Sequence, residues 1–174
     1  MSKLVVGEIE DAAGGNPYSI TLTAEQATTS NTSIDFEDIP AGVKHITVMF
    51  AGMSTSGTSV SIIQIGDSGG SVETSGYLSG ARRLTTTTDF TTGFATGNNE
   101  AAAVIHGAME LFLEDSSNNH WVCTGTTYNS GGGGGVSTYF AGGKSLSATL
   151  DIVRITTVNG SDTFDAGAAS IQFQ

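Results

Sequence analysis

The chain contains few of the residues that mark several common protein classes. Its 174 residues include one cysteine, two prolines and six basic residues, against seventeen acidic residues and a net charge of −11. A single cysteine, Cys123, cannot form an intramolecular disulfide or a cysteine-based zinc site, so we expect it to be a small buried side chain. Nucleic-acid binding depends on lysine and arginine side chains that neutralise phosphates. A chain this acidic is therefore not expected to bind nucleic acid or an anionic membrane surface.

The chain also lacks long hydrophobic runs. No apolar stretch approaches the roughly 18 residues that a membrane-spanning helix needs, so no membrane association is expected. The first residues, MSKLVVGEIED, lack a basic region followed by an apolar core, so we expect no signal peptide. Glycine, in contrast, accounts for 24 residues, about twice its ordinary share.

No segment shows a convincing helical pattern, and apolar side chains alternate with polar ones instead. Residues 43–50 place Ile46, Val48 and Phe50 on one side, which is the period of a half-buried strand. Residues 59–66 are rich in β-branched side chains. We predict that these two segments pair as antiparallel strands at the centre of a β-sandwich, joined by a connection too long for a two-residue turn.

Further strands are predicted along the chain. Residues 18–23 alternate, with Tyr18, Ile20 and Leu22 on one side, and residues 101–126 form a hairpin that buries Trp121. Other strands are expected at residues 85–88, 137–142, 144–158 and 169–174. Many short strands separated by turn signals predict an all-β fold, an antiparallel β-sandwich of jelly-roll type with long Gly/Ser/Thr-rich loops. The length suits one domain, with residues 34–174 as the sandwich core and residues 1–33 as N-terminal strands or an attachment segment of the same domain.

Two short motifs resemble catalytic or nucleotide-binding signatures but lack the necessary partners. The sequence GDSGG at residues 66–70 matches the nucleophile motif of chymotrypsin-like proteases, yet the only carboxylate between His45 and Ser68 is Asp67, so no orienting aspartate is available in that order. The sequence GGKS at residues 142–145 has Thr138 where a phosphate-binding loop needs glycine, and a strand follows it. We interpret the first as a turn and expect no phosphate site at the second.

The acidic and histidine residues offer one weak metal candidate. The loop NGSDTFD supplies Asn159, Asp162 and Asp165, whose oxygens suit calcium. The alternative is that Asn-Gly-Ser-Asp is simply a good turn sequence. The three histidines are isolated in sequence, so no zinc site and no cofactor are expected.

Four aromatic residues near glycine-rich stretches could stack on a sugar or contact a partner: Tyr77, Tyr128, Tyr139 and Phe140. Rigid β scaffolds commonly carry function on their loops, which favours this interpretation. The alternative is that they anchor loops and fill the core, as aromatic residues usually do.

The run IPAGVKHITVMFAGMSTSGTSVSIIQIGDSGG, followed by ETSGYLSG, resembles a family of bacteriophage virion proteins. The segment around Asn119, Trp121 and Val122 looks like the middle of that family, and LDIVRITTVNGSDTFDAGAASIQF looks like its closing segment. The resemblance covers most of the chain from about residue 34 onward. It carries no catalytic residues.

This resemblance implies a non-enzymatic structural component of a virion, such as a capsid decoration (cement) protein or a tail- or fibre-associated protein. Its partners would be other virion proteins, and it would act as a homo-oligomer, with a trimer as our expectation. The alternative function is a host-receptor or glycan-binding module of a phage adhesion device. A third, a hydrolase of the cell envelope, would need paired carboxylates or a triad in a cleft, which nothing in the sequence requires.

Overall fold

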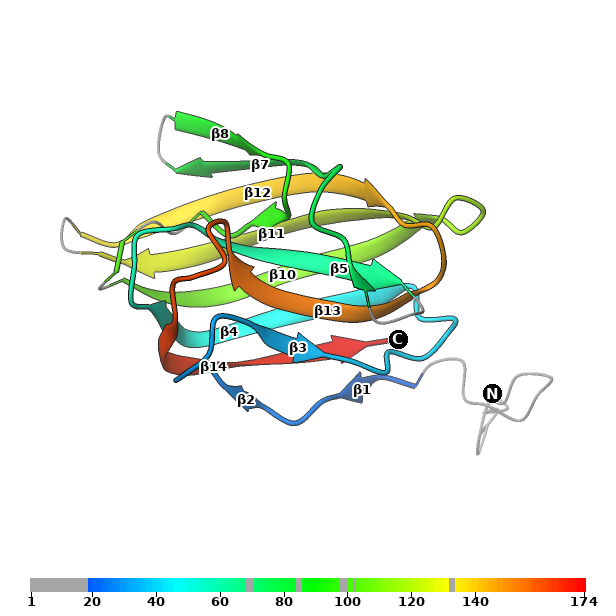
Figure 1. Cartoon of the computed structure of the whole chain (residues 1–174), viewed down its shortest axis with the longest axis horizontal. Coiled ribbons are helices and arrows are strands. Elements are labelled where there is room, and N and C mark those ends of the chain that lie inside the picture. The colour runs from blue at the N-terminus through cyan, green and yellow to red at the C-terminus, as the bar shows by residue number, and fades with distance from the viewer. Residues whose placement is uncertain (1–18, 68–70, 84–85, 98–99, 102, 132–133) are drawn as a thin grey trace, which may run out of the picture.

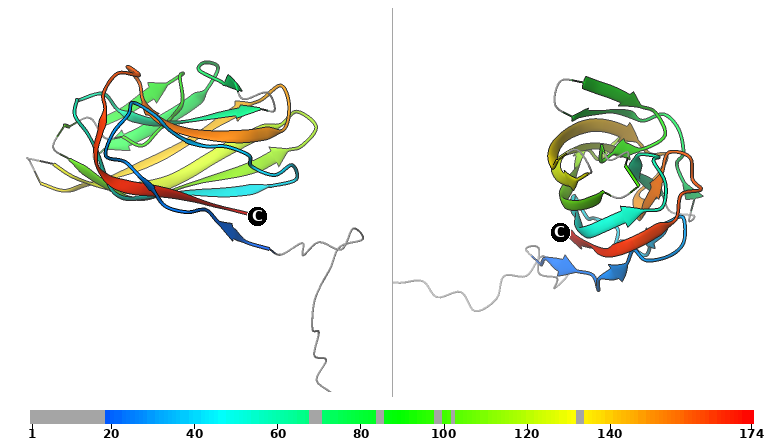
Figure 2. Two further views of the ribbon diagram at one scale, coloured as in Figure 1. Left: turned by 60° about the horizontal axis from the view of Figure 1, so that its bottom comes forward. Right: turned by 90° about the vertical axis from the view of Figure 1, so that its left-hand side faces the viewer.

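The structure is a computed structural model in which residues 19–67, 71–83, 86–97, 100–101, 103–131 and 134–174 are described. Over these residues the chain forms two antiparallel β-sheets and no helix, as the alternating pattern predicts. Figure 1 shows the two sheets as stacked layers, and Figure 2 shows the larger sheet curving around the smaller one. The predicted all-β sandwich is therefore confirmed.

The larger sheet has nine strands in the order β1-β14-β4-β10-β11-β12-β7-β8, with β2 also paired to β14. Its strands are β1 (Thr21–Leu22), β2 (Gln26–Ala27), β4 (His45–Thr55), β7 (Leu78–Arg83), β8 (Thr86–Phe90), β10 (Val104–Asp115), β11 (His120–Ser130), β12 (Val136–Ser145) and β14 (Phe164–Phe173). The long central strands β4, β10, β11 and β12 make its body. β8 ends the sheet on one side and β1 and β2 end it on the other.

The smaller sheet has five strands in the order β3-β13-β5-β6, with β9 also paired to β5. These strands are β3 (Ile34–Phe36), β5 (Ser61–Asp67), β6 (Ser71–Val72), β9 (Phe94–Ala95) and β13 (Leu150–Thr157). All seven residues of β5 are buried, so this strand is covered on both faces.

The core lies between the sheets and consists of the inward-facing side chains of their central strands. The larger sheet contributes Ile46, Val48, Met109 and Leu111, and the smaller sheet contributes Ile63, Ile65, Val153 and Ile155. Each of these side chains is fully buried, and burying one contributes about 1.5–3 kcal/mol before conformational entropy is subtracted. The alternation visible in the sequence is thus what divides each strand into a core side and an outer side.

The predicted pairing of residues 43–50 with 59–66 is wrong. β4 pairs with β10 and β14, whereas β5 pairs with β13, β6 and β9 in the other sheet. The connection between them, residues 56–60, carries the chain from one layer to the other. Both segments have apolar inner faces, and such faces can meet across a sandwich as well as side by side in one sheet.

The N-terminal strand is shorter than predicted and does not point its apolar residues inward. Tyr18 lies outside the described residues, and β1 contains only two residues, which pair with the edge of β14. Ile20 and Leu22 are 57% and 63% exposed, because Leu22 lies opposite Gln172, which lies opposite Thr47, so this side of β1 belongs to the face that points away from the smaller sheet. β1 and β2 nevertheless extend the larger sheet, so residues 19–33 join the same body as the rest.

The C-terminal half agrees more closely with the prediction. β10 and β11 form the expected hairpin, with Trp121 2% exposed and the turn at residues 116–119. The predicted strand over 144–158 begins later, at Leu150, because residues 146–149 turn towards β5. There the Asp67 carboxylate accepts hydrogen bonds from the backbone N–H groups of Ser147 and Ala148 at 3.1 and 2.9 Å, and from the Ser147 hydroxyl.

Candidate functional site

The outer face of the larger sheet carries most of the exposed large apolar side chains among the described residues. Among the described residues, seven large apolar or aromatic side chains are exposed: Ile20, Leu22, Leu78, Phe112, Tyr128, Tyr139 and Val158. The first six lie on this one face, and Val158 lies in the turn after β13. We call this surface, from Leu22 across to Leu78, the outer face.

Strand register explains why these side chains share a face. Tyr139 on β12 lies opposite Thr126 on β11, which in turn lies opposite Ala108 on β10. Since residues opposite each other in a sheet project to the same side, Tyr139 and Thr126 are neighbours on the outer face. Tyr128 is two residues beyond Thr126 and therefore lies diagonally from Tyr139.

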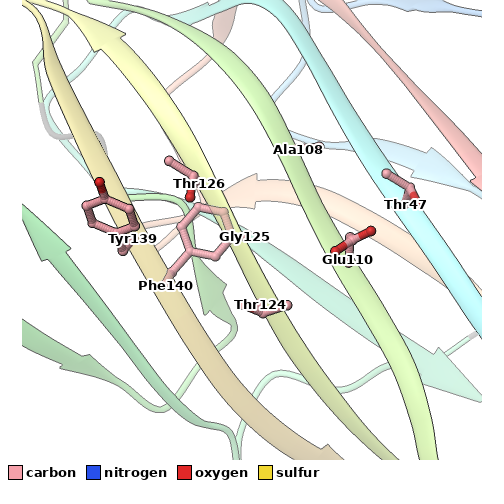
Figure 3. A pocket seen from close by; sticks show the side chains of 8 residues that line it. All are labelled: Thr47, Ala108, Glu110, Thr124, Gly125, Thr126, Tyr139 and Phe140. Atoms are coloured by element: carbon pink, nitrogen blue, oxygen red, sulfur yellow. The ribbon is translucent and has the colours of Figure 1, made fainter.

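The centre of the outer face contains a shallow hollow of about 500 Å³. It is lined by Thr47, Ala108, Glu110, Thr124, Gly125, Thr126, Tyr139 and Phe140. Figure 3 shows the side chains of Tyr139, Thr126 and Glu110 around it, on three neighbouring strands. Gly125 lies opposite the buried Phe140 and Met109, so a Cβ atom there would point to the core side of the sheet, 2.5 Å from the Phe140 ring. The hollow therefore offers hydroxyl groups, one carboxylate and one exposed ring.

A stacked pair of rings stiffens one end of the outer face. The His45 and Phe112 rings are parallel within 5°, with centroids 4.5 Å apart. The Gln174 side-chain amide donates to Nδ1 of His45 at 3.1 Å, which places the ring proton on Nε2 when the histidine is neutral. That nitrogen faces Glu110 Oε1 at 3.6 Å, which is too long for a hydrogen bond.

Two of the four aromatic residues singled out from the sequence are core residues. Tyr77 is 1% exposed, and its hydroxyl accepts from the Ile65 N–H at 2.8 Å and faces the Glu73 carbonyl at 3.0 Å. Phe140 is 4% exposed and packs in the core. Neither can therefore stack on a ligand from solvent, and burial also raises the pKa of the Tyr77 phenol.

The other two aromatic residues are accessible, but on strands rather than at loop tips. Tyr128 is 49% exposed on β11 and Tyr139 is 64% exposed on β12. Sequence reasoning missed that they share a face. The signal was present, because both alternate with the buried residues of their strands, but which strands are neighbours could not be known.

The calcium candidate is a turn whose polar atoms bond to one another. Asn159 Oδ1 accepts from the N–H groups of Ser161 and Asp162 at 3.0 and 3.2 Å, and its amide donates to Asp162 Oδ1 at 2.7 Å. Ser59 N–H donates to the other Asp162 oxygen at 2.9 Å. These bonds hold the pKa of Asp162 below its ordinary value.

Asp165, the third member of the calcium candidate, is exposed on β14. In the ranges that the structure describes, no three His, Cys, Asp or Glu side chains gather where they could hold a metal ion. Each oxygen of the Asp162 carboxylate already accepts one hydrogen bond, from Ser59 N–H and from the Asn159 amide.

The two motifs resembling catalytic signatures are structural where they are described. Gly66 and Asp67 lie within β5, and residues 68–70 are outside the described residues. The GGKS segment lies inside β12, where Lys144 is 9% exposed and its ammonium is 3.3 Å from Glu73 and 5.4 Å from the Tyr77 ring centre. A strand has no helix N-terminus to bind phosphate, so the expectation of no phosphate site at this segment agrees with its position.

Cys123 is buried, as expected, and this affects the dependence of stability on pH. Burial raises the pKa of its thiol to about 12, above the ordinary value near 9. The unfolded chain therefore loses this proton at lower pH than the folded chain, and folding stability falls as pH rises above about 9.

We expect the free energy of unfolding of Cys123→Ala to fall less steeply with rising pH than that of the wild-type chain, by up to about 1.4 kcal/mol per pH unit. Urea unfolding with reductant at several pH values from 8 to 11 measures it. Identical slopes for the variant and the wild-type chain would contradict it.

Comparison with known proteins adds no assignment to these observations. No family model, no curated protein and no solved structure matches this chain. The described residues also include no helix long and apolar enough to cross a membrane.

Proposed function

We propose that this protein is a non-enzymatic structural component of a bacteriophage virion, a capsid decoration or tail- or fibre-associated protein of jelly-roll type. It packs its outer face against other virion proteins and acts as a homo-oligomer, with three copies as our expectation. The observation that carries this proposal is the gathering of six of the seven exposed large apolar side chains on that face. The resemblance of the sequence to virion proteins supplies the setting.

The composition of the outer face supports a docking role. Interfaces are enriched in tyrosine, phenylalanine and other large apolar groups, and contiguous exposed apolar patches commonly mark interaction sites. Eight strands about 4.8 Å apart, each contributing about eight residues at about 3.3 Å, present roughly 1,000 Å². A stable interface needs about 800 Å² from each partner, so the face is large enough.

The proposal is tested by locating the chain in intact particles. Cryo-electron microscopy of the particle is expected to show symmetric copies, with the outer face, including Leu78 and Tyr139, against neighbouring virion proteins. Copies on the icosahedral shell would assign a decoration role, and copies on the tail or fibre an accessory role. Particles that contain no copy of the chain, or copies whose outer face is entirely free, would contradict the proposal.

The hollow on the outer face favours one alternative function, a glycan-binding module. An exposed tyrosine beside hydroxyl groups and a carboxylate is a chemically suitable place for a sugar, with Tyr139 as the stacking ring and Glu110 as a hydrogen-bond acceptor. A glycan array followed by titration calorimetry tests it. Binding that is lost in Tyr139→Ala and retained in Tyr139→Phe would favour this alternative, and no saturable binding would exclude it for the glycans tested.

A further inference from the structure

Among the described residues the two sheets have four edges, and one edge differs from the others in the length of its outermost strand. The edge of β14 carries β1 and β2, of two residues each, and the smaller sheet ends at the three-residue β3 and at the two-residue β6 and β9. Very short edge strands are one means by which proteins prevent their sheets from pairing with other chains. The fourth edge, β8, has five residues.

β8 has an open side. It pairs with β7 over all five residues, and no other described strand pairs with it. Figure 1 and the right-hand view of Figure 2 both show it as the outermost strand of the larger sheet. Its open side therefore presents backbone N–H and C=O groups without strand partners, and Thr87, Thr88 and Asp89 are exposed.

The sequence of β8, TTTDF, carries few of the features that protect an edge. It contains no proline and no lysine, and three threonines give it high β-propensity. Asp89 is its one charged residue. The neighbouring positions on β7 and β8 keep regular register from Ser79↔Phe90 to Arg83↔Thr86, so no bulge twists this edge away from a partner.

We infer that β8 pairs with β8 of a second copy of this chain, as antiparallel strands related by a two-fold axis. The occupant is a second copy because the strand is complementary to itself. In the register centred on Thr88, each Asp89 lies opposite Thr87 of the partner, and the two Asp89 carboxylates are only diagonal neighbours, about 7–8 Å apart. A two-fold contact uses the same surface on both copies, which is the commonest arrangement in homo-oligomers.

A pair of five-residue strands is a small interface, so we expect weak association, with a dissociation constant of about 10–100 µM. On a particle that holds many copies close together, such a contact would be populated through high local concentration. The inference does not depend on the virion role. If a trimer forms through another surface, the β8 contact would join trimers in pairs, and otherwise it gives a dimer.

The test is analytical ultracentrifugation of the full chain from about 5 µM to 1 mM. We expect the average mass of the wild-type chain to rise with concentration and to approach twice its unassociated value near 1 mM. Thr88→Lys and Thr88→Glu each place like charges opposite one another at the two-fold axis, so each variant alone is expected to remain at half the wild-type mass. An equimolar mixture of the two variants is expected to recover the doubled mass, at an affinity equal to or above that of the wild-type chain.

Two controls keep the result interpretable. Thr29→Lys adds the same charge at an exposed position beside β2, on the opposite edge of the sheet, and should associate like the wild-type chain. Unfolding midpoints of both Thr88 variants should equal that of Thr29→Lys, since all three positions are exposed. The inference is overturned if the wild-type mass does not rise up to 1 mM, if the Thr88 variants associate normally, or if their mixture does not associate.

Discussion

Particles should fail to incorporate a chain in which Leu78 and Tyr139 are both replaced by aspartate. These side chains are 80% and 64% exposed on the outer face and are the two most exposed large apolar groups described. If the face docks as proposed, both side chains are buried on binding, and truncating an interface hot-spot residue costs about 2 kcal/mol or more. A loss of about 4 kcal/mol lowers the affinity by about a thousandfold.

The same double variant should fold normally. Both side chains leave the core untouched, and substitutions at exposed positions usually change stability by less than about 0.5 kcal/mol. Val158→Asp is the matched control, because Val158 is also an exposed apolar residue, 44% exposed, but lies off the outer face in the turn after β13.

The measurement is co-sedimentation of purified chains with particles that lack the protein. The proposal predicts that Val158→Asp binds like the wild-type chain and that the double variant does not bind. Normal binding by a folded double variant would show that the outer face is not the docking surface. Equal loss in both variants would point to general charge repulsion instead.

Gly167→Ala is expected to destabilise the fold by more than about 3 kcal/mol, a large part of the 5–15 kcal/mol that holds a typical domain together. Gly167 has φ +83°, and a Cβ atom there would lie 2.2 Å from the carbonyl carbon and oxygen of Gly52. Backbone atoms inside a sheet cannot move aside as a flexible side chain can. The clash therefore adds to the roughly 1–2 kcal/mol cost of placing alanine in the left-handed region.

This close approach occurs where β14 and β4 depart from regular pairing, between Phe164 and Ala168. The Gly167 carbonyl also accepts a hydrogen bond from Thr28 N–H at 2.9 Å, so the bulge holds the residues that follow β2. A shift at Gly167 would disturb both connections.

Gly160→Ala is the matched control for this prediction. Gly160 has φ +64°, but nothing lies within 4 Å of the position of its Cβ atom. Gly160→Ala should therefore cost only the free energy of placing alanine in the left-handed region, about 1–2 kcal/mol. Urea unfolding of both variants measures the difference, and equal costs would show that the approach of Gly52 to Gly167 is not what constrains this position.

The strands of the C-terminal half were the most predictable part of the fold. β10 and β11 are adjacent in sequence, and their alternation, with Met109, Leu111 and Trp121 inward, is a local property that the amino-acid order displays directly. The turn between them is equally local. A hairpin of this kind needs no information from distant parts of the chain.

The pairing of β4 could not be predicted, because its partners β10 and β14 lie far along the chain. Alternation says which side chains of β4 face inward, but it is satisfied equally by any neighbour with a complementary inner face. The Asp67 contacts with residues 147–148, which delay the start of the predicted long strand to Leu150, depend on the same distant packing.

The sequence by itself determined that this protein is all-β and which side of most strands is apolar, since alternate residues of a strand project to opposite faces. It also pointed to Tyr128 and Tyr139 as residues of interest. Only the tertiary structure decided that these two lie on one exposed face while Tyr77 and Phe140 lie in the core, and that β8 is an open edge. The reason is physical. The order of the strands is the one that buries the most apolar surface in total, and this total depends on every segment of the chain rather than on any one of them.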